Sequence, residues 1–160
     1  MNLPPALIVF LMSMLPVGEL RAAIPVGLFL GMPAEAAFFW AELGNMIPIF
    51  FILKLLGPTS TWLMKHSVFF NKLLTKLFHS TREKHSKKFE RIGSLMIVLL
   101  EAIPLPGTGG WTGAVIAFLF DVPYWKAIGL IFIGNVIAGI LVTAGVGGAM
   151  EFIKLFSHGG

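Results

Sequence analysis

The sequence has no cysteine and few charged residues, and both absences narrow the class of protein. Without cysteine, disulfides and cysteine–metal sites are excluded, and the redox compartment is left open. Only 12% of the 160 residues are charged, about half the share found in a soluble domain. Hydrophobic residues make up 56% of the chain, and the mean hydropathy is +0.86. We therefore predict an all-α integral membrane protein with a single membrane domain, residues 1–160.

The segments that do carry charge predict the orientation of the chain. The start, "MNLPPALIVF", has neither a basic region nor a small-residue cleavage site, so we expect no removable signal peptide. Of the twelve Lys and Arg residues, nine fall between Lys54 and Arg91. Between two apolar blocks, such a basic segment is typical of a cytoplasmic loop rather than of a nucleic-acid site. We expect a multi-pass protein of the cell membrane, with loop 57–91 cytoplasmic and its basic, amphipathic helix contacting membrane lipids.

An internal repeat relates the two apolar blocks. A shift of 90 residues, without a gap, gives seven identities over the window 15–50. Prolines, glycines and asparagines, which are the informative residues in an apolar chain, are among them. We predict repeat 1 at 1–56, the amphipathic linker at 57–91, repeat 2 at 92–150 and a short tail at 151–160.

Each repeat contains two short apolar runs followed by a long one. The long runs, 34–56 and 124–148, reach the roughly 20 residues that span a bilayer. The short runs do not, so each pair forms either one kinked span or a re-entrant hairpin with its tip in the membrane. We favour hairpins, with tips at Pro16, Pro104 and Pro106. A cytoplasmic basic loop places Pro33 outside, and a hairpin over 92–122 places Pro123 inside, which makes the two repeats inverted.

Four ionisable residues lie at membrane depth, where charges are costly and generally serve function. They are Glu19, Arg21, Glu42 and Glu101. Inverted hairpins bring their tips together, so Glu19, Arg21 and Glu101 are expected to share one cavity. With Arg21 neutralising one carboxylate, another remains to bind a proton or a cation. The alternative is a structural ion pair that pins the hairpins together.

Small and polar residues mark the long runs. Asn45 and Asn135 occupy matching places and are expected to form polar contacts between helices. Glu42 is either a further proton site or a solvated carboxylate. The segment "GNVIAGILVTAGVGGAM" carries small residues at four-residue spacing, which suits a homodimer contact as well.

The segment "EAIPLPGTGGWTGAVIAF" breaks the second block with prolines and glycines. Irregular backbone at this depth is tolerated inside protein or along a water-filled cavity. Free amides at the start of a half-helix suit an anionic group, and Arg21 adds a bidentate donor. A packing kink is the alternative. The predicted substrate-binding residues are Arg21, Gly107, Thr108, Gly109, Gly110, Trp111 and Thr112.

At these two segments the chain resembles a known family. "LPVGELRAAIP" and "EAIPLPGTGGWTGA" are similar to the signature segments of the bacterial and archaeal small multidrug export proteins, distant relatives of the DedA membrane proteins. The resemblance covers nearly the whole chain and implies inverted re-entrant hairpins and transport linked to the proton-motive force. The positions it carries over are Glu19, Arg21, Glu101, Pro104, Pro106, Gly107, Trp111 and Gly113.

The resemblance leaves two substrates open. A cationic drug needs a free carboxylate and aromatic walls, whereas the polyprenyl-phosphate lipids associated with DedA proteins need Arg21 and the glycine amides. The main prediction is a small secondary transporter in which Glu19, Glu101 and Glu42 couple protons or cations. A non-transporting scaffold that interacts with lipid is the alternative of another class. We expect no enzymatic activity, metal or cofactor, because the chain shows no nucleophile–base pair or metal set.

Overall fold

The computed structural model describes residues 3–69, 71–72, 75, 87–103 and 109–157, and it is all-helical over these residues. In the described part of the first half lie the helices α1 (Pro5–Ser13), α2 (Glu19–Phe29) and α3 (Ala34–His66). In that of the second half lie the helices α5 (Lys87–Ala102), α6 (Gly110–Leu119) and α7 (Tyr124–Ser157). Two of these helices, α3 and α7, are long and apolar enough to cross a membrane. The all-α prediction is confirmed.

The link from the second short helix to the long helix has the same backbone structure in both halves. Gly31 and Asp121, ninety residues apart, both have positive φ, at 80° and 53°. A positive φ reverses the chain, and glycine and aspartate tolerate it better than most residues do. Four backbone hydrogen bonds recur around them. In the first half, the amides of Leu30, Gly31, Met32 and Ala37 donate to the carbonyls of Val26, Leu28, Gly27 and Pro33, in that order. In the second half, the amides of Phe120, Asp121, Val122 and Ala127 donate to the carbonyls of Ile116, Phe118, Ala117 and Pro123.

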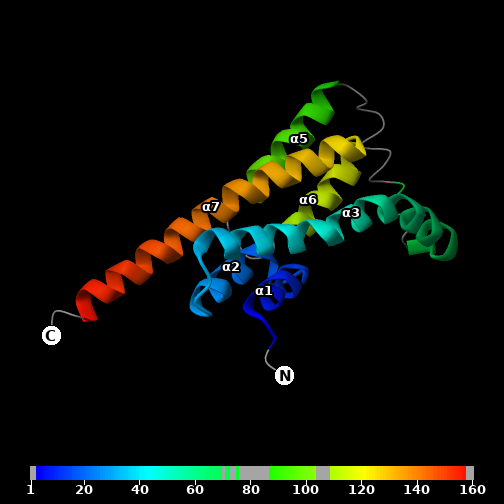
Figure 1. Cartoon of the computed structure of the whole chain (residues 1–160). Helices are drawn as coiled ribbons and strands as arrows, with labels where there is room; N and C mark the ends of the chain where they lie inside the picture. Colours follow the sequence, from blue (N-terminus) through cyan, green and yellow to red (C-terminus); the bar gives the residue numbers. More distant parts are fainter. Residues whose placement is uncertain (1–2, 70, 73–74, 76–86, 104–108, 158–160) are drawn as a thin grey trace.

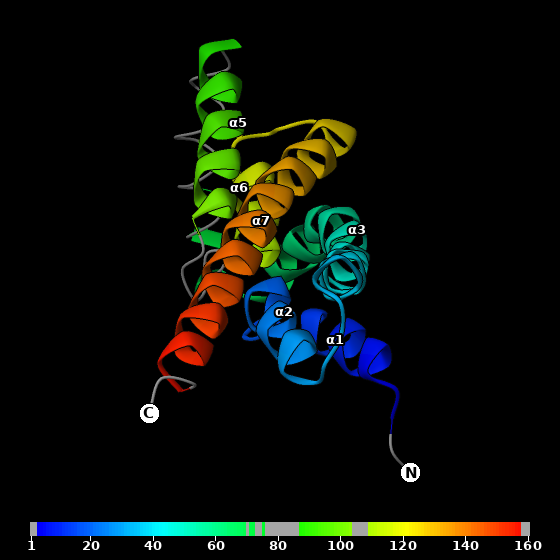
Figure 2. The same ribbon diagram turned by 60° about the vertical axis from the view of Figure 1, so that its left-hand side comes forward.

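The two halves pack against each other in a reciprocal way. Within each half the three helices contact one another, and between the halves α2 contacts α7 while α6 contacts α3. The long helices α3 and α7 also contact each other, and Figure 1 shows them running in opposite directions. In Figure 2, α1 and α2 lie at one end of the bundle and α5 rises at the other. The arrangement brings the start of α2 next to the end of α5 between the halves.

The long helix α3 passes the predicted end of repeat 1. It runs for 33 residues to His66, across Pro48 and Pro58, which is about 50 Å at 1.5 Å per residue. The hydroxyls of Ser60 and Thr61 donate to the Gly57 carbonyl at 2.8 and 3.0 Å, in the turn that contains Pro58. The boundary at 56 is therefore not a helix end, and the first ten residues of the predicted linker continue α3. Within the predicted amphipathic linker, residues 70, 73–74 and 76–86 lie outside the described residues.

Candidate functional site

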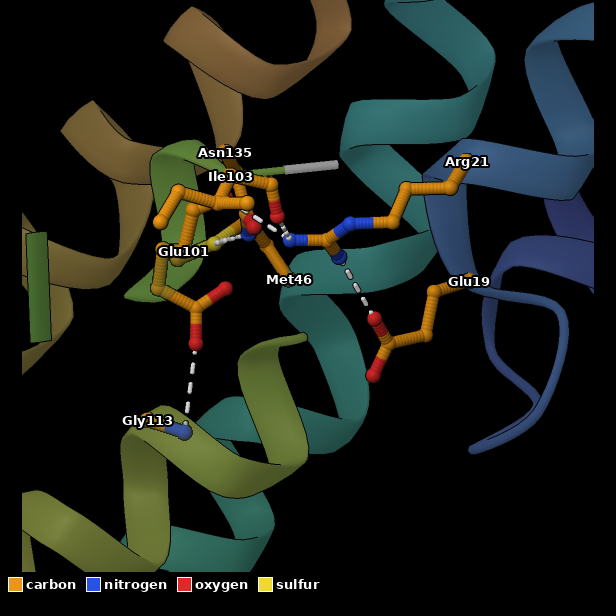
Figure 3. Close-up of polar contacts among 7 residues, drawn as sticks. All are labelled: Glu19, Arg21, Met46, Glu101, Ile103, Gly113 and Asn135. Carbon is orange, nitrogen blue, oxygen red and sulfur yellow. Dashed lines mark hydrogen bonds and ion pairs between the residues drawn. The ribbon is translucent and has the colours of Figure 1, made fainter. Parts of the chain in front are cut away.

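A buried ion pair opens α2. Arg21 Nη1 donates to Glu19 Oε2 at 2.8 Å, and the two side chains are 9% and 4% exposed. Glu19 has a φ of 45°, a left-handed conformation that a non-glycine residue adopts at a cost in backbone energy. That conformation places its carboxylate next to the guanidinium two residues later (Figure 3). The charge on each side chain is thus compensated within one turn of chain.

The same guanidinium reaches from the first half into the second. Arg21 Nη2 donates to the backbone carbonyl of Glu101 at 2.7 Å and to that of Ile103 at 3.3 Å. These carbonyls lie at and just beyond the end of α5, where helical carbonyls have no partner in the helix and the dipole is negative. Arg21 therefore caps α5 while it holds Glu19. The predicted meeting of Glu19, Arg21 and Glu101 is seen, but Arg21 contacts the main chain of Glu101 rather than its carboxylate.

The Glu101 carboxylate points toward α6 instead (Figure 3). Its Oε1 accepts a hydrogen bond from the Gly113 amide at 3.1 Å, and its Oε2 has no donor among the described residues. The side chain is fully buried. A Cβ at Gly113 would overlap this carboxylate, and one at Gly134 on α7 would overlap the Glu101 side chain. Two glycines on different helices thus make the space that the glutamate fills.

Glycine also makes room for the carboxylate of Glu19. A Cβ at Gly109, just before α6, would overlap that carboxylate, and the Trp111 amide donates to it. At this end of α6, the chain's own carboxylates thus occupy the place where we predicted an anionic substrate. Gly110 has another role, because it packs against Ile49 of α3.

The remaining residues of the predicted substrate set are placed as follows. Thr112 donates its amide to the Gly109 carbonyl at 2.8 Å, and the indole nitrogen of Trp111 is buried with no partner among the described residues. Pro16 lies in the turn that joins α1 to α2. The other predicted positions, which are Pro104, Pro106, Gly107 and Thr108, lie outside the described residues.

The polar residues of the long helices lie in the same interior. Glu42 is 7% exposed, and neither of its carboxylate oxygens has a partner in the described part of the chain. The Glu101 carboxylate is near enough to Glu42 and Glu19 for both to repel it. Asn135 of α7 donates to the Met46 sulfur of α3 at 3.8 Å, a weak contact between the long helices. The expected hydrogen bond of Asn45 across the interface is not seen, because neither polar atom of its amide has a partner among the described residues.

Gly134 is a residue whose role in this site the sequence analysis missed. We expected the small residues of α7 to serve helix contacts and a homodimer, but Gly134 packs on Glu101 and Ala138 lies in the core shared with α2. Its repeat partner Gly44 similarly packs on Ser13 of α1. The match of Gly44 with Gly134 in the sequence repeat could have indicated both close contacts, that of α3 with α1 and that of α7 with α5. Gly145 of the same segment has open space around its Cα.

Comparison with known proteins places this interior in a family. The model of the family described as "Putative small multi-drug export protein" matches residues 19–141, from Glu19 to the middle of α7. The chain belongs to this family. The match begins at the ion-paired carboxylate and includes Arg21, Glu42, Glu101 and both asparagines. Neither a curated protein nor a solved structure matches the chain.

With its family membership and its two apolar helices, the chain is a membrane protein of an export family. The relationship to DedA proteins has no support among the comparisons and stays a prediction. Among the described residues, there is no group of three His, Cys, Asp or Glu residues that would hold a metal ion. In the described part of this family member, the charged residues of the interior are Glu19, Glu42, Glu101 and Arg21.

Proposed function

We propose that the protein is a small secondary transporter that moves a cationic small molecule across the cell membrane in exchange for protons or cations. The charge balance of the buried interior is the observation that carries the proposal. Glu19, Glu42 and Glu101 are buried there, and Arg21 is the cation bound among them. Its guanidinium pairs with Glu19 and caps α5. Glu42 and Glu101 are left to attract a positively charged substrate or a coupling ion.

The substrate class follows from which groups are already engaged. An anionic substrate would have to displace Glu19 from Arg21 and from the start of α6. A cationic substrate needs no such displacement, since one oxygen of Glu101 and both of Glu42 lack hydrogen-bond donors in the described chain. The export of drugs in the family's description agrees with this choice.

Translocation of an anionic lipid phosphate is the second candidate, and one observation favours it. The guanidinium of Arg21 and the Trp111 amide at the start of α6 already hold a carboxylate, that of Glu19. The same donors would bind phosphate oxygens if the Glu19 side chain moved away. In this mechanism Glu19 and the lipid headgroup alternate at one anion site.

Transport in liposomes tests the proposal directly. We expect the purified protein to move a fluorescent lipophilic cation when a pH gradient is imposed. Glu101→Gln should reduce this transport at least about tenfold, since it removes a charge that the substrate and the coupling ion share. Glu35→Gln is the matched control, because Glu35 is exposed at the start of α3, and it should transport like the wild type. Movement of a polyprenyl phosphate alone would favour the second candidate, and no movement under any gradient would favour a scaffold.

We further propose that the two halves are inverted repeats, each a re-entrant hairpin followed by a membrane-spanning helix. The recurrence of four backbone hydrogen bonds at a separation of ninety residues supports a shared origin of the halves. The opposite directions of α3 and α7 in Figure 1 support the inversion. The short helices α2 and α6, at 11 and 10 residues, reach only about 15 Å and do not span.

Cysteine labelling tests the inversion, and the natural chain offers a clean background because it has no cysteine. Glu35 and Trp125 are exposed and occupy equivalent places just after Pro33 and Pro123. In intact cells, we expect Glu35→Cys to react with a membrane-impermeant maleimide. Trp125→Cys should react only after the cytoplasmic side is opened. Labelling of both variants from the same side would show that the halves are parallel.

A further inference from the structure

The buried interior contains an excess of hydrogen-bond acceptors. Among the described residues, the unpartnered buried oxygens belong to Glu42, Asn45, Glu101 and Asn135, whereas the Asn45 amide and the Trp111 indole each add an unpartnered donor. All four residues are at least nine-tenths buried. Buried polar groups normally have partners, and an unpartnered one points to a water or an ion. Here the acceptors outnumber the donors, and two of the four side chains are carboxylates, which favours a cation.

The four residues lie on three helices, of which α7 packs against both α3 and α5. Asn135 of α7 contacts Met46 of α3, the neighbour of Asn45. The backbone of Gly134, next to Asn135, packs on the Glu101 side chain of α5. Glu42 lies one turn before Asn45 on α3 and is close enough to Glu101 to interact electrostatically. The carboxylates and amides of this crossing therefore form one polar region inside an apolar bundle.

The charge of Arg21 attracts the Glu101 carboxylate, but this single positive charge faces more than one carboxylate. Arg21 donates to Glu19 and to the end of α5, and the Gly113 amide engages only one oxygen of Glu101. Glu19, the other titratable group facing Glu101, adds a negative charge. Because carboxylates and amide oxygens are ligands for hard cations, we propose that a dehydrated monovalent cation such as Na⁺ binds at this crossing. Its oxygen ligands are Glu42 and Asn45 on α3 and Asn135 on α7, and the Glu101 carboxylate adds charge.

The choice of a monovalent ion follows from the ligand set. Mg²⁺ gives up its water reluctantly and usually keeps several waters, which a crossing with fully buried asparagines does not accommodate. In transporters built from internal repeats, sites for Na⁺ lie near the membrane midplane where the two repeats meet. This inference rests on the proposed function, and it names Na⁺ as the coupling ion.

Thermal unfolding of the full chain in detergent is the first test. At equal ionic strength, we expect NaCl to raise Tm by about 5 °C over choline chloride, because the ion binds only the folded protein. Asn45→Ala and Glu42→Gln should each remove most of this shift. Thr143→Val and Glu35→Gln are matched controls on α7 and α3, and both should keep it, because Thr143 bonds within its own helix and Glu35 is exposed.

Binding of radioactive ²²Na⁺ is the second measurement, and it serves variants whose Tm is already low. We expect saturable binding that weakens as pH falls, since protons compete for Glu42 and Glu101. Absence of any Na⁺ response, or a response only to Ca²⁺ or Mg²⁺, would overturn the inference. Transport driven by a pH gradient without a Na⁺ response would overturn the cation site alone. Saturable Na⁺ binding without transport would support the site and contradict the transporter.

Discussion

Arg21→Ala is expected to lower the free energy of unfolding by about 3–5 kcal/mol, which is the cost of leaving a buried charge without its partner. The variant strands the Glu19 carboxylate, 4% exposed, and uncaps the carbonyls of Glu101 and Ile103. We expect Tm in detergent to fall by about 10 °C and transport to be lost. Lys54→Ala is the matched control, because it removes an exposed positive charge from α3 and should change Tm little.

A double variant separates the ion pair from the cap. Glu19→Gln with Arg21→Met removes both charges and leaves no buried ion alone, so it should be more stable than Arg21→Ala. The uncapped end of α5 remains in the double variant, and we expect this cap to account for the stability that is not recovered. A double variant as unstable as Arg21→Ala would assign the whole effect to the α5 carbonyls. An unchanged Tm in Arg21→Ala would contradict the contacts of Arg21 altogether.

The contacts of Arg21 and Glu19 link the two connections directly. Through Arg21, the start of α2 is joined to the end of α5, and through Glu19 it is joined to the start of α6. Any change in the position of α2 must therefore break hydrogen bonds at both ends of the second connection. If the proposed hairpins move during transport, Arg21 and Glu19 transmit the movement of one hairpin to the other hairpin.

Much of this arrangement could be predicted from the sequence. Apolar runs broken by proline and glycine gave the positions of the helices, because a helix in an apolar block ends where its backbone cannot continue. The intramembrane charges identified Glu19, Arg21, Glu42 and Glu101, since uncompensated charge is rare at that depth. The shift of ninety residues matched the turns at Gly31 and Asp121, although the two residues differ.

The contacts themselves could not be predicted from spacing. A guanidinium near two carboxylates and several free carbonyls has many possible partners of similar energy, and packing decides among them. The sequence favoured a contact of Arg21 with a carboxylate or a substrate, whereas one guanidinium nitrogen binds carbonyls at the end of α5. The glycines of α6 favoured an external anion, because nothing in the spacing reveals that Glu19 folds back onto Gly109.

Gly109→Ala is expected to destabilise the protein by about 1–3 kcal/mol, the usual cost of overpacking a buried site. The backbone of Gly109, with φ of −100° and ψ of −169°, is open to alanine, so strain in the main chain is not the cause. The cause is the Glu19 carboxylate, which occupies the place of the new methyl group. Glu19 would have to leave the Trp111 amide, and with it the start of α6.

Gly129→Ala provides a control of opposite sign. Gly129 lies within α7 and has no neighbour within 4 Å of a built Cβ, so alanine should stabilise the helix by about 0.5–1 kcal/mol. Thermal unfolding of both variants in the same detergent measures the difference. Equal Tm values would place the Glu19 carboxylate away from Gly109. If Gly109→Ala costs less in a Glu19→Ala background than alone, the coupling assigns its effect to this carboxylate, which identifies the glycine as part of the charged interior.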